Sequence, residues 1–206
     1  MRNIRFLLVA VFVLANFFGL GQELVKEHYQ SGELKATGKW IDGKKEGEWI
    51  FYYPSGKKNS IENYKAGKLE GEVVYFYPDE IKQGEEIWRE GNLQDSAKYF
   101  HSNGKVHRKG VYQAGQYAGT WKYFFENGKT ERIVSYKDGL PEGEILMYNE
   151  GFLIQKGNYH LGLEEGEWRF YSDEGQLKFF GSYQAGKPIG IWYELKKGKQ
   201  RIYKKY

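Results

Sequence analysis

The sequence predicts an all-β protein, an elongated array of antiparallel β-hairpins that follows an N-terminal signal peptide. Three observations lead to this fold class. A glycine-led motif of 23 or 24 residues recurs along the chain, aromatic residues return at fixed places within it, and turn-forming residues separate its short apolar stretches. Each unit of such an array buries its apolar face only against its neighbours, so the repeat decides the architecture.

The repeat is clearest when the units are aligned on their leading glycine. The steps between successive leading glycines are 24, 24, 24, 24, 23 and 24 residues. An aromatic ring stands three residues before each of them: Trp40, Tyr64, Trp88, Tyr112, Tyr136, Tyr159 and Tyr183. Six residues after them stand Trp49, Val73, Ala97, Trp121, Ile145, Trp168 and Trp192.

The composition agrees with strands and narrows the classes of partner. Aromatic residues make up 18% of the chain and 27 residues are glycine, which suits strands joined by tight turns. Cysteine is absent, so the chain has neither disulfides nor thiolate metal sites. Without Arg2 and Arg5 of the leader, 29 basic residues face 27 acidic ones. A net charge of +2 does not predict a nucleic-acid partner, because such proteins carry a basic face.

Residues 1–21 have the features of a secretory signal peptide. Basic residues at Arg2 and Arg5 precede the apolar run 6–18, and Gly19 and Gly21 place small residues before Gln22. The run falls short of the ~20 residues that cross a bilayer. We therefore expect cleavage, export to the periplasm, cell envelope or medium, and no membrane span in the mature chain. The alternative is a retained anchor.

Residues 22–206 form the predicted repeat domain. A half-repeat at 22–42 precedes units that start at residues 43, 67, 91, 115, 139, 162 and 186. Each unit reads as two strands and two turns. The first strand is predicted at 47–53, with counterparts at 71–77, 119–125 and 166–171, and the turn after it carries Pro, Asn or Asp before glycine. The second turn is predicted at 43–47 and its counterparts, where we expect the charges to form a solvated rim.

Two regions depart from the repeat. In residues 67–104, Val73 and Ala97 replace the repeat's tryptophan and Glu80 and Asp95 replace turn glycines, so this part is expected to be the least regular. Drift in a redundant array and a built-in site at 67–114 are both open explanations. The lysine-rich residues 196–206 predict a final edge strand protected from further pairing. A basic contact with a membrane or an anionic polymer is the alternative there.

The pattern Gly-x3-Gly-x-Trp-x2-Tyr-x3-Gly resembles the bacterial variant of the MORN repeat. The resemblance implies a β-hairpin meander that serves as a scaffold or binding surface, and some bacterial chains of this kind are labelled YwqK-like antitoxins. The repeat-defining positions are Gly43, Gly47, Tyr52, Gly56, Gly67, Gly71, Gly115, Gly119, Phe124, Gly128, Gly139, Gly143, Gly162, Gly166, Tyr171, Gly175, Gly186 and Gly190.

No motif for catalysis, a cofactor or a metal is evident. Only two of the four histidines, His101 and His107, lie near each other, and neither has a carboxylate or cysteine at a metal-binding spacing. A recurring glutamate could in principle supply an acid–base pair. A catalytic pair is needed once, however, whereas this residue returns at Glu48, Glu72, Glu144 and Glu167. We therefore expect a protein that is not an enzyme.

The sequence leaves three functions open. The first is an exported scaffold that binds a protein partner, with Trp49, Trp121, Trp168 and Trp192 as candidate contacts unless stacking buries them in the core. The second is binding of cell-wall glycan or the envelope surface through aromatic hairpins, which can also form cation–π cages. The third is an antitoxin-type binding protein, which requires a cytoplasmic location.

Overall fold

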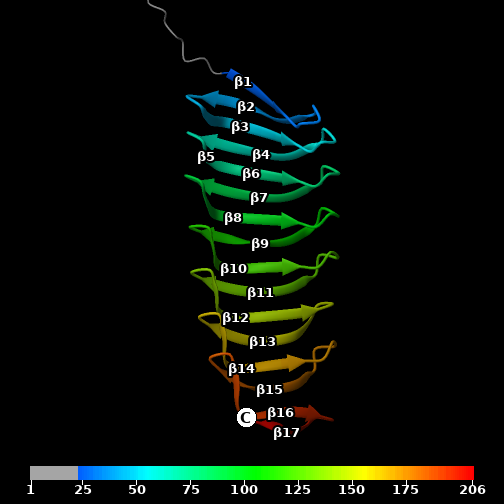
Figure 1. Ribbon diagram of the computed structural model, residues 1–206. Coiled ribbons are helices and arrows are strands. Elements are labelled where there is room, and N and C mark those ends of the chain that lie inside the picture. Colours follow the sequence, from blue (N-terminus) through cyan, green and yellow to red (C-terminus); the bar gives the residue numbers. More distant parts are fainter. Residues whose placement is uncertain (1–22) are drawn as a thin grey trace, which may run out of the picture.

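The computed structural model describes residues 23–206, so the predicted signal peptide at residues 1–21 lies outside the described residues. Between residues 23 and 206 the chain forms 17 strands of one antiparallel sheet and no helix. The strands stack in a single column in chain order (Figure 1). The predicted all-β hairpin array is therefore confirmed. This described part contains no helix of the length and apolarity needed to cross a membrane.

Each strand pairs with its neighbours in the sequence, and β5 and β6 together replace one longer strand that is interrupted at Glu70. The strands are β1 (Glu23–His28), β2 (Leu34–Ile41), β3 (Lys44–Tyr52), β4 (Lys58–Lys65), β5 (Lys68–Leu69), β6 (Gly71–Phe76), β7 (Lys82–Arg89), β8 (Asn92–Phe100), β9 (Val106–Gln113), β10 (Gln116–Phe124), β11 (Thr130–Lys137), β12 (Leu140–Asn149), β13 (Phe152–His160), β14 (Leu163–Tyr171), β15 (Leu177–Gln184), β16 (Lys187–Lys196) and β17 (Lys199–Lys205).

The turns at the leading glycines are shorter than the sequence predicts. Asp42 and Gly43 have φ of 49° and 70°, as both residues of a two-residue type I′ hairpin turn must. Strand β3 begins at the next residue and runs through Gly47, so the predicted turn at 43–47 is wrong in extent. Gly47 has φ of 69°, and the β2–β3 register shifts beside it. This glycine forms a bulge that bends the strand.

One face of the sheet carries the core. A line of residues along this inner face, one from each of β2–β4 and β6–β16, holds four tryptophans and the glycines on which they lie. We call it the core row: Gly38, Trp49, Glu62, Val73, Glu86, Ala97, Gly110, Trp121, Val134, Ile145, Gly157, Trp168, Gly181 and Trp192. Most of these residues are buried, although only one layer of sheet is present. The rings themselves cover the apolar face.

The region predicted to be least regular keeps the geometry of the repeat. Glu80 and Asp95 have φ of 70° and 57°, the left-handed conformation that glycine adopts at the matching positions of other units. Strands β7 and β8 remain paired along their length. The expected irregularity is therefore limited to the break at Glu70 between β5 and β6.

Side chains link each unit to the next along the rim of mid-unit turns. The hydroxyl groups of Tyr29, Tyr53 and Tyr77 each donate a hydrogen bond to a backbone carbonyl 23 residues later, over 2.7, 2.7 and 2.9 Å. His101 takes this place in the following unit and donates from Nε2 to the carbonyl of Phe124. These contacts tie neighbouring hairpins together at a repeat spacing.

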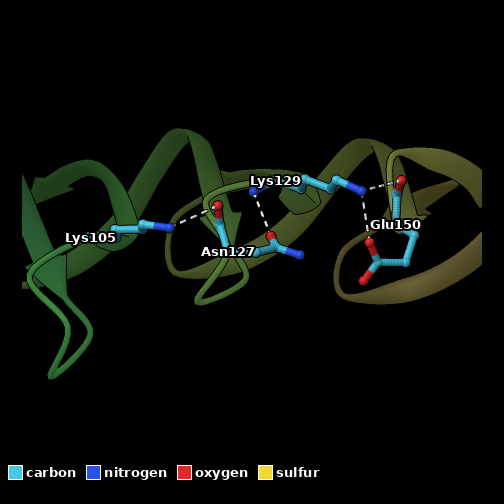
Figure 2. Close-up of polar contacts among 4 residues, drawn as sticks. All are labelled: Lys105, Asn127, Lys129 and Glu150. Carbon is cyan, nitrogen blue, oxygen red and sulfur yellow. Dashed lines mark hydrogen bonds and ion pairs between the residues drawn. The ribbon is translucent and has the colours of Figure 1, made fainter.

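Lysines continue this rim further along the array (Figure 2). The ammonium of Lys105 donates to the carbonyl of Asn127 over 3.2 Å, and Lys129 donates to the carbonyl and the carboxylate of Glu150 over 3.1 and 2.7 Å. The side chain of Asn127 also accepts a hydrogen bond from the backbone N–H of Lys129, which holds its own turn in shape. These polar residues are therefore connectors between units.

Carboxylates also link neighbouring units on the opposite rim, where the leading turns lie. Glu46, Glu70 and Glu142 each accept a hydrogen bond from the backbone N–H of the next leading turn, at Ala66, Glu90 and Leu161. The expectation of a purely solvated rim is thus incomplete. These charged side chains are half-buried, and they satisfy donors of the adjacent hairpin.

Candidate functional site

The four tryptophans considered as partner contacts lie in the core. Trp49, Trp121, Trp168 and Trp192 are 0%, 0%, 1% and 6% exposed. Trp168 packs edge-on against Tyr159 and Tyr183, with ring centroids 5.3 and 5.7 Å away. A partner cannot reach these rings across the sheet, so the core interpretation of the sequence is the one that the structure supports.

Tryptophan and glycine occur together in the core row. A Cβ built on Gly38, Gly110 or Gly157 would lie 2.2 Å from the ring of the tryptophan eleven residues later. Gly181 and Trp192 repeat this contact. Where tryptophan is missing, so is glycine: the matching pairs are Glu62 with Val73, Glu86 with Ala97, and Val134 with Ile145. This pairing is visible in the sequence and explains which positions need a glycine.

Glu86 occupies space that a tryptophan fills in other units. It is 8% exposed, and its carboxylate accepts hydrogen bonds from Tyr75 (3.1 Å), Tyr99 (2.5 Å) and Nε1 of Trp88 (3.0 Å). Burial raises the pKa of both tyrosines, and the adjacent Glu86 carboxylate raises it further. Three donors satisfy the buried charge. Sequence reasoning missed this residue because its partners come from three different strands.

The opposite face of the sheet is open. Cross-strand partners on this outer face form a second unbroken line, which we call the outer row: Thr37, Ile50, Ile61, Val74, Glu85, Lys98, Lys109, Lys122, Ile133, Leu146, Lys156, Arg169, Phe180, Tyr193 and Ile202. All of its members are half-buried or exposed. The outer row therefore offers an accessible surface along the length of the array.

The recurring glutamates considered as an acid–base pair lie beside the outer row. Glu144 forms an ion pair with Lys156 at 2.7 Å, and Glu167 forms one with Arg169 at 2.6 Å. All four side chains are about half exposed. Such pairs contribute little to stability in water, and they place exposed charges on the surface.

The C-terminal end of the array contains an aromatic cleft on the inner face. Six rings line its volume of about 260 Å³: Phe170, Phe179, Tyr183, Trp192, Tyr203 and Tyr206. Tyr203 and Tyr206, on and directly after strand β17, are 57% and 52% exposed. Strand β17 forms the predicted lysine-rich edge, and Lys204 lies over the ring of Tyr206 at 4.5 Å.

The two neighbouring histidines are in contact. The ring centroids of His101 and His107 are 4.5 Å apart. Burial lowers the pKa of His107, and the positive charges of His101 and Arg108 lower it further. Within residues 23–206 no three His, Cys, Asp or Glu side chains are grouped in a way that could hold a metal ion.

The repeat geometry agrees with a comparison of the sequence with family models. Four segments match the model described as the MORN repeat variant, at residues 45–66, 96–114, 118–138 and 164–185. These four segments are therefore similar to the MORN repeat variant. Each match covers a β-hairpin of the array: β3–β4, β8–β9, β10–β11 and β14–β15. The hairpins between the matched segments have the same strand pairing although their sequences differ, as in β6–β7 with Val73.

Two solved structures show a distant likeness to this chain. Chains in the crystal structures of TcdB2-TccC3 and TcdB2-TccC3-Cdc42 are each 12% identical to this chain, with a TM-score of 0.17. The alignments cover 89% of this chain and 14% of those chains. No curated protein matches the sequence.

Proposed function

We propose that the protein is a non-enzymatic, exported or envelope-associated scaffold that binds a protein partner through the outer face of its sheet. The outer row carries this proposal. The inner face is covered by its own aromatic rings, whereas the outer row is accessible from Thr37 to Ile202. Blocks of apolar residues and blocks of charged residues follow one another along it, so the row offers a partner both apolar area and charge. MORN repeats generally take part in protein or membrane interactions, which agrees with this role.

Site-specific photo-crosslinking tests the proposal. A photoreactive residue is placed at Ile133 in the outer row, and in a separate protein at Asn127 on the mid-unit rim. We expect a discrete crosslinked partner from position 133 in an extracytoplasmic fraction, and none from position 127. Crosslinks that form only at position 127 would contradict binding through the outer face. A mature N-terminus at Gln22 in the same fraction would support export and exclude the antitoxin function.

Binding of cell-wall glycan is the second candidate, and the C-terminal aromatic cleft favours it. Five of its six rings, all except the buried Trp192, are half-buried or exposed and can stack on sugar rings, and the tyrosine hydroxyls can bond to sugar hydroxyls. Pull-down on purified peptidoglycan and polysaccharides tests this function with the Tyr203→Ala/Tyr206→Ala variant as the matched control. If the unaltered protein binds glycan at micromolar strength and the Tyr203→Ala/Tyr206→Ala variant does not, glycan recognition would replace protein binding as the favoured function.

A further inference from the structure

Three lysines in the outer row face one another without neutralising partners. Lys98 is the cross-strand partner of Lys109, and Lys109 is that of Lys122, so three strands in succession present an ammonium on the same face. Like charges directly opposite each other destabilise a sheet. No carboxylate among the described residues forms an ion pair with any of the three. The other cations of the row, Lys156 and Arg169, are both paired.

These lysines line a groove. It has a volume of about 370 Å³, and Ser96 and Thr120 add hydroxyl groups to its wall. Three carboxylates also line the groove, those of Glu72, Glu85 and Glu86. Lys82 pairs with Glu85, and Glu86 already accepts hydrogen bonds from Tyr75, Trp88 and Tyr99. The part of the groove lined by Lys98, Lys109 and Lys122 thus carries positive charge without an ion-pair partner, which is complementary to an anionic occupant.

Apolar residues flank the three lysines along the same line. Ile61 and Val74 precede them in the outer row, beyond Glu85, and Ile133 and Leu146 follow them. Five strand spacings separate Val74 from Ile133, which corresponds to about 24 Å. A helix of about 16 residues has this length. The surface therefore fits a segment with acidic residues at its centre and apolar residues at both ends.

We propose that Lys98, Lys109 and Lys122 form the docking site of an acidic protein segment whose apolar ends rest on Val74 and Ile133. This inference rests on the proposed scaffold function and names the chemistry of its partner. A layer of lipid headgroups would satisfy the lysines, but at that depth it presents no apolar groups to the residues on either side. A protein segment satisfies both parts of the surface.

Binding of synthetic peptides tests the proposal. The probe is a 16-residue peptide with four central glutamates and leucines toward both ends; a scrambled peptide of the same composition and an analogue with lysine in place of glutamate are the controls. We expect the probe to bind at least tenfold more tightly than either control, as measured by calorimetry. Equal binding of the scrambled peptide, or binding of anionic phosphatidylglycerol vesicles without binding of the probe, would overturn the proposal.

A matched pair of variants locates the site. The K98Q/K109Q/K122Q variant removes the three facing lysines, and the K199Q/K204Q/K205Q variant removes the same charge from β17. The first should weaken binding of the probe at least tenfold, and the second less than twofold. Circular dichroism shows whether both variants remain folded. If both triple variants weaken binding of the probe equally, the loss follows from net charge alone, and the assignment of the site to Lys98, Lys109 and Lys122 would be overturned.

The crosslinking experiment separates this inference from the scaffold function. A partner that still crosslinks at position 133 in the K98Q/K109Q/K122Q variant would leave the scaffold function intact and contradict the acidic-segment site. Loss of the crosslink in that variant, but not in the β17 variant, would support both.

Discussion

The indole ring of Trp168 lies directly on the backbone of Gly157, in the space that any Cβ at this position would occupy. The distance from such a Cβ to Cδ2 of the ring would be 2.2 Å, far below an ordinary contact. The same chain fills the equivalent place between β11 and β12 with Val134 and Ile145, which are cross-strand partners. Ring and glycine therefore form one packing unit, and either both are present or both are replaced.

A double-mutant cycle at this pair should show strong coupling. Gly157→Val alone collides with the indole ring and should cost about 2 kcal/mol or more, because overpacking forces side chains or backbone to move. Trp168→Ile alone leaves a cavity and should cost about 3 kcal/mol. The double variant copies Val134 and Ile145, so its loss should be at least 1 kcal/mol smaller than the sum. Urea unfolding measures all three, and additive losses would show that the two residues act independently.

Removal of the buried carboxylate should destabilise the centre of the array. Glu86→Ala leaves the donors of Tyr75, Tyr99 and Trp88 without their acceptor, and each buried unsatisfied group costs about 1–3 kcal/mol. We expect a loss of about 3 kcal/mol or more in the free energy of unfolding. Glu85→Ala is the control on the outer face and should cost less than about 1 kcal/mol. Similar losses for the two variants would contradict the role of Glu86.

Lys109 should be a residue whose charge lowers stability. Because it stands between Lys98 and Lys122, Lys109→Gln relieves two repulsions and should raise the free energy of unfolding by about 0.2–1 kcal/mol. Lys156→Gln is the matched control in the same row. That variant breaks the ion pair with Glu144 and should leave stability unchanged or slightly lower. A higher melting temperature of the Lys109→Gln variant, with an unchanged or lower one for Lys156→Gln, would confirm the prediction. A lower stability of the Lys109→Gln variant would refute it.

Mild acid should weaken the array near His107. Burial and neighbouring positive charges lower the pKa of this side chain in the folded state, so the unfolded chain binds the proton more readily. Stability should therefore fall as the pH drops below about 6.5, the ordinary pKa of histidine. His107→Gln should reduce this dependence when urea midpoints are compared between pH 7.5 and 5.5. The exposed His28→Gln variant should keep it, and an unchanged slope in the His107 variant would be the contrary result.

The sequence predicts the fold more fully than the site. The glycine and aromatic spacing is sufficient for the hairpin array, and the pairing of Gly157 with Trp168 can be read directly from an eleven-residue separation. The sequence predicts that the second glycine of a unit belongs to a turn, whereas a left-handed glycine can also bend a strand, as Gly47 does. The number of residues in that bulge sets which side chains meet across strands. The outer row therefore emerges only from the three-dimensional register.

The position of Glu86 shows a second limit of sequence reasoning. In the sequence it is one of many glutamates, and nothing local separates it from Glu85. Its burial follows from the missing tryptophan at Ala97, and its hydrogen bonds come from Tyr75 on β6, Trp88 on β7 and Tyr99 on β8. Such convergence depends on how neighbouring units stack.

Pairing between consecutive strands makes the length of this molecule adjustable. Each strand finds its partners next to it in the chain, through a leading turn as short as Asp42–Gly43 or a mid-unit turn around Gly56. Insertion of one more 24-residue unit would add two strands and lengthen the column by about 10 Å without altering a contact elsewhere. Duplication or loss of units can thus change the length of the molecule in steps of one repeat unit.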